Sequence, residues 1–230
     1  MPTLTNDSLV TQYVATCKLQ AFKNWNTMTK NQRGTAIVNA AAMALLTCGV
    51  PKPTANVSVL AGGYQGLFDF QTWSLKMSVA LFDGDMDYNN IHPYFVNTLE
   101  TVYHEARHCE QWWNMARFHA LGRQPADVAR ELGIPMAIAT RACQKPMKSS
   151  RAGHDPMLNL TKGWYESVYG SHGGLQRGIA LGALALKRTQ QVGRLVPMDQ
   201  FHRHRYAEYK ENLPEEVDAW AIQDLVRAKF

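Results

Sequence analysis

This 230-residue sequence has few cysteines and only a small excess of positive over negative charge. Its four cysteines include no Cys-x-x-Cys pair, which excludes a zinc ribbon and a dense disulfide framework. The even count still allows up to two disulfide bridges. The 24 Lys and Arg residues exceed the 19 Asp and Glu residues by five, and this excess is scattered, so no nucleic-acid partner is expected.

Long apolar runs are also missing. The most apolar stretch, residues 36–50, is too short and too interrupted to span a membrane. Residues 1–12 lack the basic head and the apolar run of a signal peptide. We therefore expect a soluble protein without a membrane span, which would need a secretion apparatus or a fused carrier if it is exported.

The composition fits one globular domain over residues 1–230, because 46% of the residues are apolar and 19% are charged. Apolar residues at helical spacing predict two helices in residues 8–48, broken near residues 30–34. Alternating and aromatic residues predict two or three strands in residues 56–83, with Gly62-Gly63 as a turn.

The strongest helical pattern covers residues 93–121, where Pro93 suits a first helical position and Gly122 suits the exit. Shorter helices are expected at 126–132, 135–145, 157–169, 174–191, 198–210 and 214–228. The predicted fold class is therefore α+β, mostly helical, with a small sheet that precedes the longest helix.

The longest predicted helix contains the pattern HExxH, formed by His104, Glu105 and His108. Residues four apart lie on one face of an α-helix, so the two imidazoles can converge on a single zinc ion. Glu105 lies beside them and can take a proton from a water molecule that the metal has made acidic. The spacing therefore predicts a catalytic zinc site.

The two faces of this helix differ in character. One stripe is apolar and is expected in the core: Phe95, Leu99, Val102, Ala106, Cys109 and Trp113. His104 and His108 lie on the opposite side, together with Glu100 and Gln111. The alternative interpretation is that both histidines are exposed surface residues that flank a glutamate by chance.

A catalytic zinc site needs a third protein ligand. The continuation HExxHxxGxxH is absent, because Gln111 and Asn114 occupy its glycine and histidine positions. His119 is eleven residues beyond His108, about 16 Å along a continuous helix, which is too far. The third ligand must therefore come from elsewhere in the chain.

The best candidate is Glu216, in the segment LPEEVDAW near the C-terminus. Pro214 opens a helix there, and Glu216-x-x-Ala219 places a carboxylate and a small residue on one face. The carboxylate can reach the metal while Ala219 allows a close approach of the two helices. Glu215 stays open as the alternative ligand because helix boundaries shift easily.

With this glutamate on a later helix, the sequence resembles the gluzincin class of zinc peptidases. The resemblance implies a zincin-like domain in which His104, His108 and Glu216 bind Zn²⁺ and Glu105 is the base. Glu216-x-x-Ala219 looks like a variant that several gluzincin families use. The pattern ExxxD is not met, since position 220 is tryptophan, so the aspartate that usually supports a ligand histidine is missing.

The segments TLETVYHEARHCEQWWNMARF and LPEEVDAW are also similar to metallopeptidase domains of bacterial secreted effectors and polymorphic toxins. This second resemblance implies a protein or peptide substrate and a cognate immunity or inhibitor protein or a secretion carrier. It also implies delivery into a target cell. The periplasm is preferred over the cytoplasm as the site of action, because an even cysteine count tolerates oxidation there.

Three further features could support catalysis. Glu100 lies one turn before His104 and could accept its second ring N–H, although a solvated surface glutamate is the plain alternative. Donors that could stabilise the transition state are crowded just before Glu216: His202, His204, Tyr206 and Tyr209. By analogy with zincins, a strand in residues 67–79 could bind an extended substrate at its edge.

The function expected from these residues is hydrolysis of peptide bonds by a zinc metallopeptidase. One alternative keeps the zinc and changes the substrate to a non-protein or cell-wall amide. The other is a catalytically silent metal-binding interaction protein. Retention of Glu105 argues against the silent protein, because a structural site needs no base.

Overall fold

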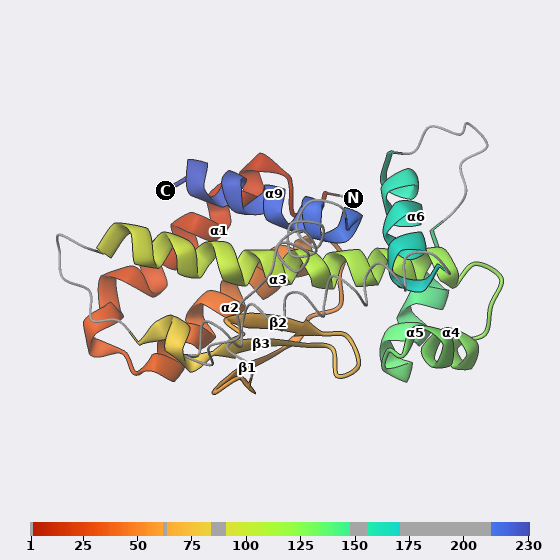
Figure 1. The fold of residues 1–230 in the computed structure, drawn as a ribbon, viewed down its shortest axis with the longest axis horizontal. Helices are drawn as coiled ribbons and strands as arrows, with labels where there is room; N and C mark the ends of the chain where they lie inside the picture. The colour runs from red at the N-terminus through yellow and green to blue at the C-terminus, as the bar shows by residue number, and fades with distance from the viewer. Residues whose placement is uncertain (1, 62–63, 84–90, 148–155, 171–212) are drawn as a thin grey trace, which may run out of the picture. The chain divides into compact units, whose positions relative to one another are not determined.

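The structure is a computed structural model that describes residues 2–61, 64–83, 91–147, 156–170 and 213–230 (Figure 1). These residues are mostly helical with one small sheet, so the predicted α+β class is confirmed. The chain divides into two compact units. The first comprises Met1–Asp69, Trp73–Glu110 and Ala219–Phe230, and the second comprises Phe70–Thr72 and Gln111–Asp218.

The first unit begins with α1 (Asp7–Gln20), the 3₁₀ helix η1 (Phe22–Thr27) and α2 (Lys30–Thr47). The sequence predicted two helices here, and both are present. The break between them lies before residue 30, however, and not at residues 30–34.

Two residues explain this shift. Thr29 caps α2 and forms a capping box with Gln32, which starts the helix at Lys30. Gly34, within the range where the break was predicted, lies inside α2, where a Cβ atom would come within 2.7 Å of Val57 Cγ2. This glycine allows close packing against the sheet and does not make a turn.

The sheet contains β1 (Thr54–Ser58), β2 (Gly66–Asp69) and β3 (Ser74–Ser78) in the order β1-β3-β2. β3 is parallel to β1 and antiparallel to β2. Three strands agree with the prediction, but the last predicted strand residues form the 3₁₀ helix η3 (Val79–Phe82). The expected Gly62-Gly63 turn lies outside the described residues.

The helix α3 (Ile91–His119) follows, close to its predicted bounds, and its residues up to Glu110 belong to the first unit. The whole predicted apolar stripe is buried: Phe95, Leu99, Val102, Ala106, Cys109 and Trp113. The later part of α9 (Pro214–Ala228) runs along α3 in the first unit (Figure 1), where Arg227 makes two hydrogen bonds to the Glu100 carboxylate.

A buried ion pair also lies on α3. Arg107 and Glu110 are 1% and 2% exposed and form a salt bridge one turn apart. The two carboxylate oxygens of Glu110 also accept hydrogen bonds from the main-chain N–H of Leu4, at 3.3 and 3.1 Å. The pair therefore fastens the start of the chain to the helix that carries the HExxH pattern.

The second unit contains α4 (Pro125–Leu132), α5 (Met136–Gln144) and α6 (Pro156–Tyr169), all close to their predicted bounds. His119, at the end of α3, contacts the Glu131 carboxylate at 2.6 Å and the Tyr165 hydroxyl at 2.9 Å. The predicted helices at 174–191 and 198–210 lie outside the described residues.

All four cysteines are free thiols, so neither of the disulfide bridges that the even count allowed is formed. Burial raises the pKa of the Cys48 thiol to about 12 and also raises the pKa of Cys17 and Cys109. These thiols are therefore protonated at neutral pH and unreactive. Among the residues that the structure describes, no helix is long and apolar enough to cross a membrane.

The buried pair gives a test of the fold. We expect Glu110→Ala to lower the free energy of unfolding by about 3–5 kcal/mol, because Arg107 then loses a buried carboxylate that balances its charge. Urea unfolding followed by tryptophan fluorescence would measure this loss. Asp127→Ala is the control, since its pair with Arg130 is exposed and should change stability by less than about 1 kcal/mol. Equal losses in the two variants would contradict the interpretation.

Candidate metal centre

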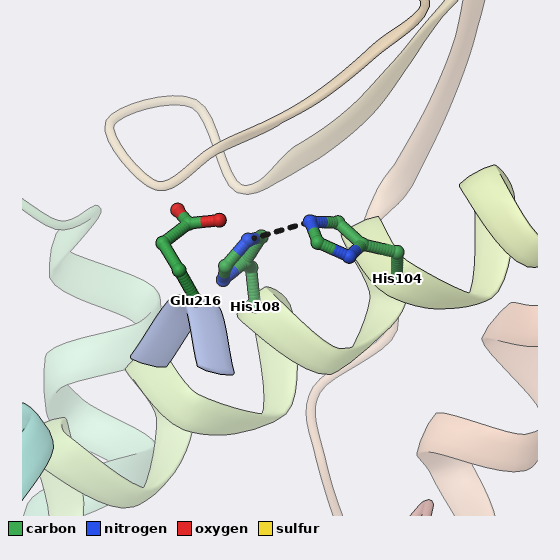
Figure 2. Close-up of side chains that lie close together, drawn as sticks. All are labelled: His104, His108 and Glu216. Carbon is green, nitrogen blue, oxygen red and sulfur yellow. Dashed lines mark hydrogen bonds between the residues drawn. The ribbon is translucent and has the colours of Figure 1, made fainter. Parts of the chain in front are cut away.

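Three predicted ligands come together in the structure. His104 and His108 from α3 and Glu216 from α9 each offer a ligand atom, and these atoms lie within 4.8 Å of one another. Figure 2 shows the two imidazoles and the carboxylate gathered at one point. Within the described ranges, no other group of three His, Cys, Asp or Glu residues could hold a metal ion. The group contains Glu216 and not the alternative, Glu215.

The site is buried. His104, His108 and Glu216 are 7%, 8% and 3% exposed. The interpretation of two exposed surface histidines is therefore wrong. Trp220 of α9 covers part of His104, with the two ring centres 5.2 Å apart in an edge-to-face arrangement. Three polar side chains buried together need compensating partners, and a bound cation is a partner that suits all three.

The tautomer of His104 follows from its neighbours. Its Nδ1 lies 2.9 Å from the main-chain carbonyl oxygen of Ala219. Because a carbonyl oxygen can only accept, Nδ1 carries the proton and Nε2 keeps its lone pair. Nε2 is the nitrogen that faces His108, at 3.1 Å from the Nε2 of that ring. This is the protonation pattern that a metal-bound histidine requires.

The distances also fit a metal ion. Two nitrogen atoms bound to one tetrahedral metal at about 2.1 Å lie about 3.4 Å apart. The observed separation of 3.1 Å between the two Nε2 atoms needs only a small adjustment. Two imidazoles and one carboxylate leave a fourth position open, which is the ligand set of many catalytic zinc sites. Imidazole also binds iron, nickel and copper, so the residues define a transition-metal site more firmly than they define zinc.

Glu100 does not take the role that the sequence suggested. Its carboxylate accepts hydrogen bonds of 2.8 and 3.0 Å from Arg227. The acceptor for His104 Nδ1 is the Ala219 carbonyl instead. The side-chain amide of Gln223 lies 3.2 Å from the same nitrogen. Sequence reasoning missed the acceptor at Ala219, because every residue has a main-chain carbonyl and no residue type marks its use.

Glu215 lies next to the ligand but serves another contact. Its main-chain carbonyl accepts a hydrogen bond of 2.8 Å from the side-chain amide of Gln111. The same amide nitrogen lies 2.7 Å from the Asp218 carboxylate. Both bonds fix the first turn of α9, which is the turn that carries Glu216. The remaining candidates, His202, His204, Tyr206 and Tyr209, lie outside the described residues.

The predicted base, Glu105, contacts the sheet. Its Oε2 accepts a hydrogen bond of 2.8 Å from the main-chain N–H of Phe68 in β2. Its side chain packs directly on Gly66, where an added Cβ atom would lie 2.8 Å from Glu105 Cγ. Sequence reasoning missed this use of Gly66, since the glycine lies in a strand and makes no turn.

No protein-family model, curated protein or solved structure matches this chain. The chemistry of the protein is therefore inferred from the residues of the site.

Matched variants of the two neighbouring glutamates can test the ligand set. We expect about one metal ion per chain in the unaltered protein, and a metal affinity at least ~10-fold lower in Glu216→Gln, because the amide replaces a charged ligand. Glu215→Gln should keep the metal. Elemental analysis and competition with a chelator would measure both variants. Metal loss in Glu215→Gln alone would assign the ligand role to the neighbour.

Proposed function

We propose that this protein is a zinc-dependent metallopeptidase that hydrolyses peptide bonds. The observation that carries the proposal is the buried group of His104, His108 and Glu216, with Glu105 adjacent to it on α3. A metal site that only stabilised a fold would use a closed set of four ligands and no carboxylate base beside it. Three ligands and an adjacent glutamate favour catalysis.

A metal ion held by this group supplies Lewis acidity and lowers the pKa of water toward neutrality. Glu105 is then the residue that takes the proton from the attacking water and passes it to the leaving amine. The Ala219 carbonyl keeps His104 in the required tautomer and orientation. Burial of the ligands keeps competing water away from them.

A peptide is the substrate that the surroundings of Glu105 favour. The carboxylate lies at β2, the last strand of the described sheet, and contacts a main-chain N–H there. An extended peptide can add to a strand edge through main-chain hydrogen bonds, which would bring a peptide bond beside the base. A zinc-dependent amidase that acts on a cell-wall substrate uses the same residues, and it would be distinguished by its activity on peptidoglycan.

We further propose an antibacterial role as a secreted effector. The support is the similarity of the segments around the HExxH pattern and LPEEVDAW to effector and toxin metallopeptidases. A cognate immunity protein and a secretion carrier are the partners that this role would require. The preference for the periplasm rests on the even cysteine count, which tolerates oxidation, and the four cysteines form no disulfide in the structure.

The chemistry can be tested with Glu105→Gln, which replaces the base by an amide of equal size. We expect the variant to fold and to bind metal like the parent, because Glu105 is not a ligand. Its turnover on an unfolded protein substrate should fall by at least ~10²-fold, the lower range for general acid–base catalysis. Full activity in Glu105→Gln would refute the mechanism, whatever metal is bound.

The biological role can be tested by expression in a bacterium, directed separately to the cytoplasm and to the periplasm. We expect growth inhibition in one compartment and relief of this inhibition by Glu105→Ala. Immunoblots should show equal amounts of the two proteins. If the parent and the variant are equally harmless in both compartments, the effector role is wrong, while the peptidase proposal stands.

A further inference from the structure

The contact between Glu105 and β2 uses a specific edge of the strand. The main-chain N–H of Ser78 in β3 donates to the carbonyl of Gln65 at 2.8 Å. In an antiparallel pair, alternate residues bond to the partner strand and the residues between them point away from it. Gln65, Leu67 and Asp69 therefore bond toward β3, while Gly66 and Phe68 direct their main-chain groups to the outer edge of β2.

Glu105 occupies this outer edge. Its Oε2 accepts the Phe68 N–H at 2.8 Å, in the place where a carbonyl of an added strand would bond. Gly66 makes the approach possible, because a side chain there would meet Glu105 Cγ and, at 3.1 Å, Met77 Sδ. In the described part of the sheet, β3 is the only strand that pairs with β2.

We propose that the Phe68 N–H holds Glu105 in the free protein, and that an extended peptide releases the base by taking this N–H for one of its own carbonyls. This inference rests on the proposed function and adds a coupling between substrate and base. The carboxylate and the peptide compete for one donor. Binding of a peptide therefore removes this hydrogen bond from Glu105, and the bond is kept when no peptide is bound.

The competition predicts the direction in which peptide affinity changes when Glu105 is replaced. A hydrogen bond to a charged group is stronger than one to a neutral group, so the carboxylate is the harder acceptor to displace. In Glu105→Gln a neutral carbonyl can still accept from the Phe68 N–H, and Glu105→Ala removes the side-chain acceptor at position 105. Peptide affinity should therefore rise in the order parent, Glu105→Gln, Glu105→Ala.

The experiment uses the full chain, freed of metal with a chelator, and a fluorescent pool of uncharged, end-capped octapeptides. Fluorescence anisotropy should show an affinity about ten-fold higher for Glu105→Ala than for the parent, as expected for loss of a competing charged hydrogen bond. Glu100→Ala is the control, since it removes a carboxylate from α3 that pairs with Arg227 and lies about 7.5 Å along the helix from Glu105. Its peptide affinity should equal that of the parent.

Higher peptide affinity in Glu105→Ala could come from loss of the competing acceptor or from the smaller side chain. Hydrogen exchange of the Phe68 amide, followed by NMR, distinguishes these two causes. We expect slow exchange in the free parent, faster exchange in free Glu105→Ala, and slow exchange again when the peptide is added to that variant. An unchanged Phe68 amide on peptide addition would overturn the proposal, as would equal peptide affinities in the parent and Glu105→Ala.

Failure of the coupling can be told apart from failure of the proposed function. A protein that binds metal and needs Glu105 for turnover, but gives equal peptide affinities, is a peptidase without this coupling. A protein in which no variant binds the peptides refutes both the coupling and the extended-peptide substrate. The metal and turnover measurements then decide between an amidase and a silent metal-binding protein.

Discussion

The hydrogen bond between His104 Nδ1 and the Ala219 carbonyl is the contact on which the metal centre depends. It fixes the proton on one ring nitrogen and leaves the lone pair on the nitrogen that faces His108. It also joins α3 to α9, the helix that carries Glu216. A single contact thus sets both the chemical state of one ligand and the packing of the helix that supplies another. Ala219 itself is fully buried at this contact.

The helix α3 also carries several buried polar and charged side chains. Arg107 and Glu110 form a buried pair on α3, and Gln111 bonds to the main chain and to a carboxylate at the start of α9. A helix that only had to pack could use apolar side chains at these positions, and buried ion pairs often add little net stability. These groups fix orientation instead. The Gln111 bonds restrict how α3 and the start of α9 can rotate, and the Glu110 bonds hold Leu4 against α3.

Glu105 shows how the sheet contributes to a site whose residues are mostly helical. The base is held by a main-chain donor and fits against a glycine, so the strand controls both its position and its freedom. Under the proposed coupling, the donor serves the base before the peptide arrives and serves the peptide afterwards. The base would then be most available when a bond to be cleaved is present.

The sequence by itself determined the helices of the described residues and the HExxH face of α3, and it narrowed the third ligand to Glu216 or Glu215. These depend on local spacing: histidines four residues apart share a helix face, and an apolar stripe of the same period must be buried. It also determined most helix bounds, because proline favours the first turn of a helix and glycine favours the residue that follows its end. The break before α2 was misplaced by a few residues, since Gly34 lies inside the helix, where it admits Val57.

Tertiary structure alone decided which groups support the ligands. Glu100 had the right spacing to assist His104, but it pairs with Arg227, which is distant in sequence and close in space. The acceptor at His104 and the donor at Glu105 are main-chain groups of Ala219 and Phe68. Every residue carries such groups, so no pattern of side chains can predict which of them are used. Only the packing of α9 and β2 against α3 selects the two that act.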